Sequence, residues 1–226
     1  MQVLSRIEIE RMFDISVVQT PNGLEDVKKL ADYARKRRFC AVHALPTWLP
    51  TLKELMEGNN DTLVGSSVGF PSGGHTTDTK IFEAKQLISQ GVQEMDVMMN
   101  VGRLRSGHYD FVENEIRALV DIAGNMTLKV IIETGYLTTD EIKKACELCI
   151  KAGADYVKTG SGWTKVATTF EVVSLIVDFV AGSIKVKASG GIRDLESIRK
   201  MHQIGVSRFG INMESSIQIL KQAEND

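Results

Sequence analysis

Three charged residues lie inside stretches of this chain that otherwise have the composition of buried strands. Asp96 lies in EMDVMM, Lys158 ends DYVK, and Lys187 lies in IKVKAS. Charges are costly to bury unless they compensate one another. A lysine beside a second cation in a dry pocket has a lowered pKa and can attack a carbonyl as a neutral amine. The set therefore predicts carbon–carbon bond chemistry through a lysine Schiff base, with the second lysine and the carboxylate moving protons.

The spacing of these residues places them on neighbouring elements of a repeating unit. Lys158 and Lys187 are 29 residues apart, and Asp96 and Lys158 are 62 residues apart. These separations match one and two strand–helix units, so the three side chains are expected at similar heights facing one interior. A single lysine in a strand is also compatible with a purely structural ion pair. The three together favour the catalytic interpretation.

Short β-branched runs alternate with longer amphipathic runs along the chain, which predicts eight strand–helix units. The predicted strands are 13–18, 40–45, 62–70, 92–100, 128–134, 155–159, 183–189 and 206–211. The predicted helices are 24–37, a helix opened by Pro46, 76–91, 109–124, 138–153, 168–182, 194–205 and 213–224.

Eight such units in 226 residues favour a closed (β/α)₈ TIM barrel in a single domain spanning residues 1–226. A short amphipathic helix is expected before the first strand. An open doubly wound sheet is the alternative. Such a sheet normally carries G-x-G-x-x-G after its first strand, and the chain has VVQTPNG there.

Composition excludes several classes of function. The net charge is −2 with both signs mixed along the chain, which argues against a nucleic-acid partner. No run of 18 apolar residues occurs, and MQVLSRIEIERMF has no apolar core of a secretory signal, so no membrane partner is expected. The three cysteines, Cys40, Cys146 and Cys149, are few and odd in number, which indicates a cytoplasmic protein. Cys146 and Cys149 lie within a predicted helix and are interpreted as ordinary helix residues.

Several long motifs occur in an order that resembles the deoxyribose-phosphate aldolase family, from about residue 12 to residue 210. The motifs are GFPSGGHTTDTKIFEAK, EMDVMMNVGRLRSG, KVIIETGYL, KAGADYVKTGSG, VKASGGIRDLES and RFG. The resemblance implies a class I aldolase in which Lys158 forms the Schiff base, Lys187 perturbs it, and Asp96 relays protons. It also implies a set of substrate-binding residues: Asp14, Lys129, Gly160, Gly162, Gly190 and Gly191.

The implied reaction is the reversible cleavage of 2-deoxy-D-ribose 5-phosphate to acetaldehyde and D-glyceraldehyde 3-phosphate. No cofactor and no metal are implied, because the iminium takes the place of a Lewis acid; a homodimer is compatible with a barrel of this kind. Three alternatives stay open. They are an aldolase of the same mechanism with another, unphosphorylated substrate pair, a Schiff-base dehydratase, and a non-catalytic barrel that binds a sugar phosphate.

The chain departs from the family pattern at places that face the expected site. Ile211–Glu214 follow RFG where the family has small hydroxyl residues, and the nearest serines are Ser215 and Ser216. His43 stands near the end of the second predicted strand, as a substrate contact or as a core histidine satisfied by backbone. Lys185 has the same strand parity as Lys187; either it pairs with Glu94, Glu133 or Asp14 inside the barrel, or the strand has other bounds than those predicted. Trp163 is expected to narrow the pocket.

Overall fold

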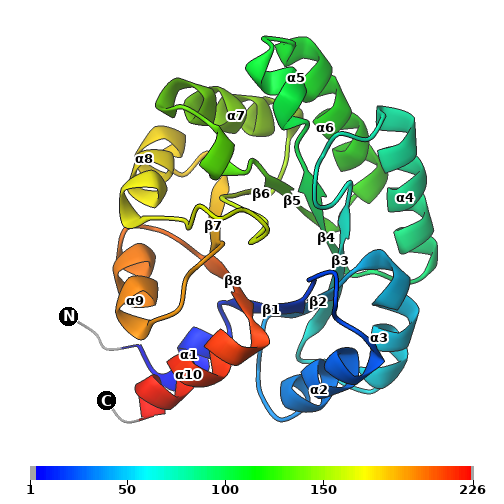
Figure 1. The fold of residues 1–226 in the computed structure, drawn as a ribbon, viewed down its shortest axis with the longest axis vertical. Helices are drawn as coiled ribbons and strands as arrows, with labels where there is room; N and C mark the ends of the chain where they lie inside the picture. The colour runs from blue at the N-terminus through cyan, green and yellow to red at the C-terminus, as the bar shows by residue number, and fades with distance from the viewer. Residues whose placement is uncertain (1–3, 225–226) are drawn as a thin grey trace.

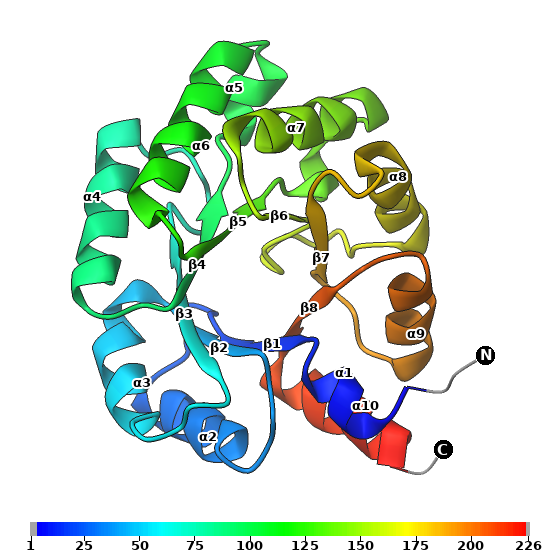
Figure 2. The ribbon, with the colours of Figure 1, turned by 180° about the vertical axis from the view of Figure 1, so that it is seen from behind.

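The computed structural model describes residues 4–224. Its eight strands are all parallel and close into one barrel in the order β1-β2-β3-β4-β5-β6-β7-β8. Figure 1 shows the helices around the outside of this barrel, and Figure 2 shows the same ring from behind. The predicted (β/α)₈ barrel is therefore confirmed. The strands are β1 Phe13–Val17, β2 Ala41–Ala44, β3 Leu63–Val68, β4 Glu94–Met98, β5 Thr127–Ile131, β6 Tyr156–Lys158, β7 Lys185–Ser189 and β8 Arg208–Asn212.

The helices alternate with the strands as expected, with three short additions. The predicted N-terminal helix is present as α1 (Arg6–Glu10) and packs beside the last helix. The segment after Pro46 divides into a 3₁₀ turn and a short α-helix, and further short helices follow β4 and β5. The remaining helices are α2 Leu24–Ala34, η1 Pro46–Trp48, α3 Leu49–Leu55, α4 Thr77–Ser89, α5 Val101–Arg105, α6 Tyr109–Ala123, η2 Thr134–Tyr136, α7 Thr139–Ala152, α8 Phe170–Val180, α9 Leu195–Gln203 and α10 Met213–Glu224.

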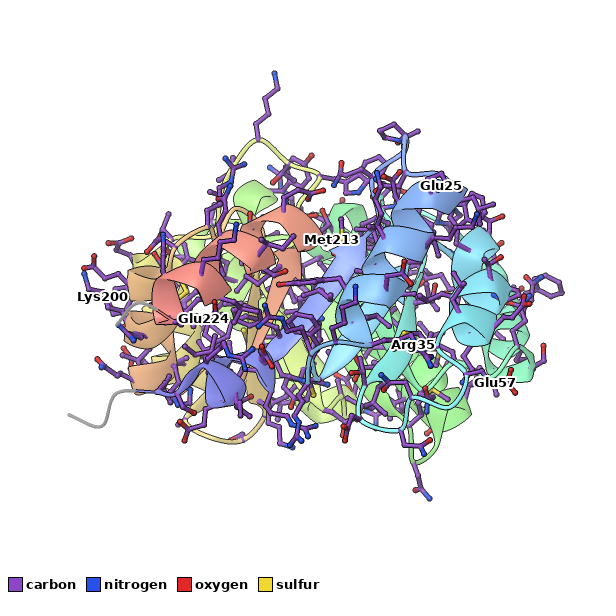
Figure 3. All side chains as sticks on the ribbon, turned by 90° about the horizontal axis from the view of Figure 1, so that it is seen from below. Glu25, Arg35, Glu57, Lys200, Met213 and Glu224 are labelled. Carbon is purple, nitrogen blue, oxygen red and sulfur yellow. The ribbon has the colours of Figure 1, made fainter. Side chains whose placement is uncertain are left out.

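Local sequence accounts for where the helices begin and end. Thr138 starts α7 through a capping box: its hydroxyl accepts from the Glu141 N–H, and the Glu141 carboxylate accepts from the Thr138 N–H at 2.8 Å. Gly153 ends the same helix in the left-handed conformation, with φ of 82°. Each strand is followed by a helix that begins at the end of the barrel where the strands finish, whereas α1 precedes β1. In Figure 3 the helix starts near Glu25 and Met213 lie towards one edge, and Arg35 and Glu224 lie towards the other.

The apolar core lies between the barrel and the helices rather than in the barrel interior. Val42, Val97 and Val157 point outward from their strands, and all three are at most 1% exposed. The alternate positions on the same strands point inward, and many of them are polar or charged. A barrel whose outer face supplies the core can place charges inside only if they compensate one another. Among the described residues, no helix is long and apolar enough to cross a bilayer.

Candidate active site

The three charged residues singled out from the sequence meet inside the barrel. The Nζ of Lys158 lies 2.7 Å from Oδ2 of Asp96, and the Nζ of Lys187 lies 2.9 Å from the same oxygen. Each of the three side chains is less than a tenth exposed. The register explains the meeting, because Lys158 pairs directly with Lys187 across β6 and β7. The prediction that these residues face one interior is therefore confirmed.

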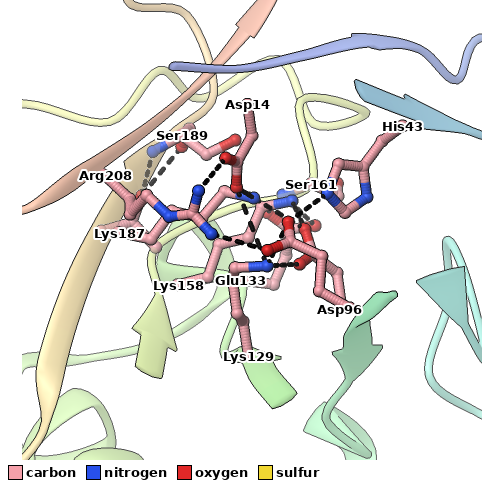
Figure 4. Close-up of polar contacts among 12 residues, drawn as sticks. Asp14, His43, Asp96, Lys129, Glu133, Lys158, Ser161, Lys187, Ser189 and Arg208 are labelled. Atoms are coloured by element: carbon pink, nitrogen blue, oxygen red, sulfur yellow. Dashed lines mark hydrogen bonds and ion pairs between the residues drawn. The ribbon is translucent and has the colours of Figure 1, made fainter. Parts of the chain in front are cut away.

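A wider network of ion pairs surrounds this centre, as Figure 4 shows. Lys129 contacts Glu94 at 2.6 Å and Asp96 at 3.3 Å, so it lies within the barrel as expected. Asp14 contacts Lys187 at 2.6 Å. The network joins three carboxylates to four cations: Asp14, Glu94, Asp96, Lys129, Lys158, Lys187 and Arg208.

Arg208 and Glu94 are central to this network, although the sequence did not single out Arg208 and named Glu94 only as a partner. The guanidinium of Arg208 lies 2.8 Å from Asp14 and 2.6 Å from Glu94, so it bridges two carboxylates at the start of β8. Those carboxylates raise the pKa of Arg208 against the effect of its burial. Its position within the motif RFG and its inward strand parity were the available signals.

Burial and neighbouring charges set the protonation states of Asp96 and Lys158 differently. Burial by itself raises the pKa of Asp96, but the charges of Lys158, Lys187 and Lys129 outweigh it and hold the pKa well below its ordinary value. Burial lowers the pKa of Lys158; Asp96 opposes this shift, and the charge of Lys187 adds to it. The surrounding lysines therefore keep the Asp96 carboxylate ionised, whereas burial and the charge of Lys187 favour the neutral amine of Lys158.

The space above Lys158 is small and polar. A cavity of about 30 Å³ lies over the lysine and is bounded by Asp14, Asp96 and the hydroxyl side chains of four serines. Lys129 does not line it and lies among the carboxylates instead. The serines are Ser16, Ser67, Ser161 and Ser189.

A second cavity of about 300 Å³ adjoins the first at the carboxyl ends of β1, β6, β7 and β8. Gly162, Gly190 and Gly191 line it, as expected for a site formed by backbone N–H groups. Gly160 does not: a Cβ there would lie 3.0 Å from the Glu133 carboxylate and 3.2 Å from the Ser189 carbonyl. Gly160 is therefore a closely packed position, and its part in the loop that holds the substrate phosphate stays a prediction.

The segment after β8 supplies the remaining wall of this larger cavity. Asn212 caps α10 by accepting from the Ser215 N–H at 2.8 Å, so the first turn of α10 faces the cavity. Ser215 lines the cavity, whereas Ser216 is fully buried and donates to the Met213 carbonyl. Glu214 stands at the rim of the same cavity. In place of the several hydroxyl residues that the family has there, this wall therefore consists of the Ser215 hydroxyl, the first turn of α10 and the Glu214 carboxylate.

Glu133 is a second residue that the sequence did not mark as functional. It is 3% exposed, and its φ of 54° is in the left-handed region that non-glycine residues rarely adopt. Its carboxylate accepts from the Ser161 N–H at 3.1 Å, which ties the end of β5 to the loop after Lys158. The unusual backbone is thereby explained as the means of turning this carboxylate towards that loop.

The structure excludes one of the two interpretations that the sequence left open for Lys185 and one of the two for His43. Lys185 is not inside the barrel: it is exposed at the first position of β7, and its Nζ lies 5.5 Å from the centre of the Tyr156 ring. The alternation of side chains along a strand predicts whether a residue points into the barrel, but not how far along the barrel axis it lies. Lys185 is the first residue of β7 and lies at the end of the barrel where the strands begin, outside the closed interior. His43 is not satisfied by backbone either, because its Nε2 lies 2.8 Å from the Glu94 carboxylate.

Trp163 joins two loops at the barrel mouth but lines neither of the two cavities described above, so its narrowing of the pocket stays a prediction. Its indole N–H donates to the Val18 carbonyl at 2.9 Å, which carries the loop after β6 across to the loop after β1. Its ring packs edge to face with Phe70, with centroids 5.7 Å apart, and Phe70 lines the small cavity over Lys158. In Figure 3 this yellow loop rises above the helix starts.

Asp14, His43 and Glu94 place ligand atoms within 4.8 Å of one another, which is close enough for a metal ion. Lys187 and Arg208 contact Asp14, and Lys129 and Arg208 contact Glu94. These cations already compensate both carboxylates, and we assign no metal to the group.

Comparison with known proteins decides the family. Residues 5–210 match the family model described as DeoC/LacD family aldolase. The chain belongs to the DeoC/LacD aldolase family. A deoxyribose-phosphate aldolase of Rhizobium meliloti (strain 1021) is 46% identical over 215 residues, which cover 95% of this chain and 87% of that protein. A deoxyribose-phosphate aldolase of Geobacillus sp. (strain WCH70) is 42% identical, with 96% and 98% covered.

Solved structures agree with this placement of the DeoC/LacD aldolase. An aldolase named QR15 superposes with a TM-score of 0.90 at 34% identity, with 97% of each chain covered. The deoxyribose-phosphate aldolase of Aeropyrum pernix, described as tetrameric, has a TM-score of 0.88 at 24% identity, covering 97% of this chain and 92% of that one. The second match supports the fold alone.

Proposed function

We propose that this DeoC/LacD aldolase cleaves 2-deoxy-D-ribose 5-phosphate reversibly to acetaldehyde and D-glyceraldehyde 3-phosphate, with Lys158 as the Schiff-base residue. The observation that carries the proposal is the contact of Lys158 and Lys187 with one oxygen of Asp96 beneath a small polar cavity. Homologues named for this activity cover most of the chain and support the substrate.

The bond changes follow from a neutral Lys158. Its Nζ attacks the C1 carbonyl of the open-chain sugar, and loss of water from the carbinolamine gives an iminium. The C2–C3 bond then breaks, its electron pair moves to the iminium nitrogen as an enamine, and the C3 hydroxyl loses its proton to become the new aldehyde. Protonation of the enamine at C2 and hydrolysis release acetaldehyde and the free amine. Asp96 accepts and returns protons between these steps, and Lys187 favours the neutral amine.

The pH dependence of kcat/KM is expected to follow the Lys158 amine. Only the neutral form attacks, so kcat/KM rises as pH rises through the pKa of Lys158, which lies below its ordinary value of 10.5. Lys187→Met removes a repelling charge and a competitor for Asp96, and both changes raise that pKa. The rising limb of the pH profile should therefore move to higher pH. A limb that stays in place or moves to lower pH would show that Lys187 does not control the amine.

The larger cavity suits the phosphate of the substrate. The N–H groups around Gly190 and Gly191 and the first turn of α10 favour an anion, whereas the Glu214 carboxylate at the rim opposes one. Glu214→Gln is therefore expected to lower KM for 2-deoxyribose 5-phosphate by about fivefold through loss of a screened repulsion. KM for free 2-deoxyribose should not change, which makes the unphosphorylated sugar the control. Equal shifts for both sugars would remove Glu214 from the phosphate site.

Two further properties remain proposals. The chain is compatible with a homodimer, and its cysteine usage indicates a cytoplasmic location. Sedimentation of the purified protein tests the first, and fractionation of the source cells tests the second.

A further inference from the structure

A third cavity, of about 460 Å³, lies at the barrel mouth beside the two cavities of the active site. We call it the outer cavity. The proposed reaction makes no use of it. The indole of Trp163 is one of its walls, and the next residue after Phe70, Pro71, is another. Its lining includes the apolar side chains of Pro71, Met98, Val101, Tyr136 and Trp163. An apolar space therefore lies on one side of Trp163, close to the carbonyl chemistry on the other.

Phe70 is the side chain through which Trp163 reaches the small cavity over Lys158. Phe70 lines that cavity and is the largest apolar residue of its lining, and its ring packs edge to face with the indole, with centroids 5.7 Å apart. The Gly73 N–H donates to the Gly69 carbonyl at 2.8 Å, and the Gly69 N–H donates to the Glu83 carboxylate at 2.7 Å. These bonds hold the backbone next to Phe70, so its ring can move outward only into the space that the indole fills.

Two hydrogen bonds hold Trp163 in this place. The indole N–H donates to the Val18 carbonyl at 2.9 Å, and the backbone N–H donates to the Ser161 hydroxyl at 3.0 Å. Val18 and Ser161 both line the small cavity, as Phe70 does. The side chain of Trp163 is nevertheless 36% exposed, so its removal leaves the buried core intact and should cost little stability.

The small cavity has two ends that differ in what they adjoin. Ser16, Ser161 and Ser189 line both this cavity and the one of about 300 Å³, so the two spaces join at the serines. Phe70 lines the small cavity but not the larger one. The Phe70 end is therefore the end that lies away from the space suited to a phosphate.

We propose that Trp163 is a positioning residue that limits the size of the donor aldehyde by holding Phe70 against the small cavity. This role rests on the proposed aldol reaction, in which C2 of the donor, as the enamine on Lys158, forms the new bond to the acceptor carbonyl. The phosphate-bearing acceptor enters from the larger cavity, so a substituent on C2 is directed away from it, towards Phe70. A cavity of about 30 Å³ leaves room there for few atoms. A longer donor needs the space that the indole fills.

The test compares acetaldehyde with butanal as donors to D-glyceraldehyde 3-phosphate, with each product identified by its mass. Trp163→Ala removes the ring, whereas Trp163→Phe keeps an aromatic ring beside Phe70 and lacks the indole N–H. The ratio of kcat/KM for butanal over acetaldehyde should rise about tenfold or more in Trp163→Ala, as expected when two further carbons gain an apolar space. In Trp163→Phe the ratio should stay close to the wild-type value. A rise of the same size in Trp163→Phe would overturn the role of the ring contact.

The remaining outcomes separate this role from the proposed function. Wild-type protein that forms no product from acetaldehyde and D-glyceraldehyde 3-phosphate would overturn the aldol reaction itself. An unchanged ratio in Trp163→Ala would overturn the control of donor size, including the case in which both rates fall equally and the case in which neither protein uses butanal. If Trp163→Ala does not fold, Trp163→Leu leaves part of the same space open, and a rise in the ratio is required of it.

Discussion

Replacing Lys158 by alanine is expected to abolish cleavage of 2-deoxyribose 5-phosphate, with kcat lower by about 10⁴-fold or more. No other amine in the barrel is placed to replace it. Lys129 is fully buried among carboxylates that raise its pKa above the ordinary value despite burial, and Lys187 is held by Asp14 and Asp96. The rate of acetaldehyde formation measures the effect.

The same variant should fold normally, because the charges that remain are balanced. Without Lys158 the network retains three carboxylates and three cations: Asp14, Glu94, Asp96, Lys129, Lys187 and Arg208. The matched control is Lys185→Ala, since Lys185 is exposed on the same sheet and should keep wild-type kcat. Substantial activity in Lys158→Ala would mean that another lysine is the nucleophile.

Asp96→Asn is expected to damage both stability and catalysis. The asparagine keeps the shape of the side chain but removes the carboxylate that Lys158 and Lys187 share. Lys129 also loses one of its carboxylate partners. Removing one partner of a buried ion pair reduces the free energy of unfolding by about 3–5 kcal/mol. For a domain of this size the melting temperature should fall by about 10 °C. Loss of the proton relay should lower kcat by about 10²- to 10⁴-fold.

The stability difference between wild type and Asp96→Asn should depend on pH in a defined direction. The folded-state pKa of Asp96 lies well below its ordinary value of 3.8. The contribution of ionised Asp96 to the free energy of unfolding is therefore complete above pH 3.8 and is lost as pH falls through the folded-state pKa. Urea unfolding at pH 7 and in acid measures this difference. The matched control is Asp61→Asn, whose side chain is 61% exposed; equal losses in both variants at pH 7 would contradict the account.

The barrel and its central residues could be predicted because both depend on local patterns. Eight strand–helix units follow from periodicity, and strand parity together with one-unit spacing brings Lys158 and Lys187 to one interior. The capping residues Thr138 and Thr169 mark the starts of α7 and α8 to within a residue or two of the expected bounds. That residues 1–226 form a single domain stays a prediction.

The partners within the interior could not be predicted, because they depend on the register between strands far apart in the chain. Lys185 and Lys187 share strand parity, yet only Lys187 reaches the carboxylates; the height at which β7 enters the barrel decides this. Arg208 bridges Asp14 and Glu94, which are 194 and 114 positions away from it in the sequence. No local pattern encodes separations of that length.

Borohydride trapping with 2-deoxyribose 5-phosphate, followed by peptide mass mapping, identifies the lysine that forms the Schiff base. Reduction converts the iminium to a stable secondary amine and so marks the lysine that carried it. We expect one adduct, on the peptide that contains Lys158, and none on Lys129, Lys185 or Lys187. An adduct on a different lysine, or none from folded protein that turns over this sugar, would contradict that expectation.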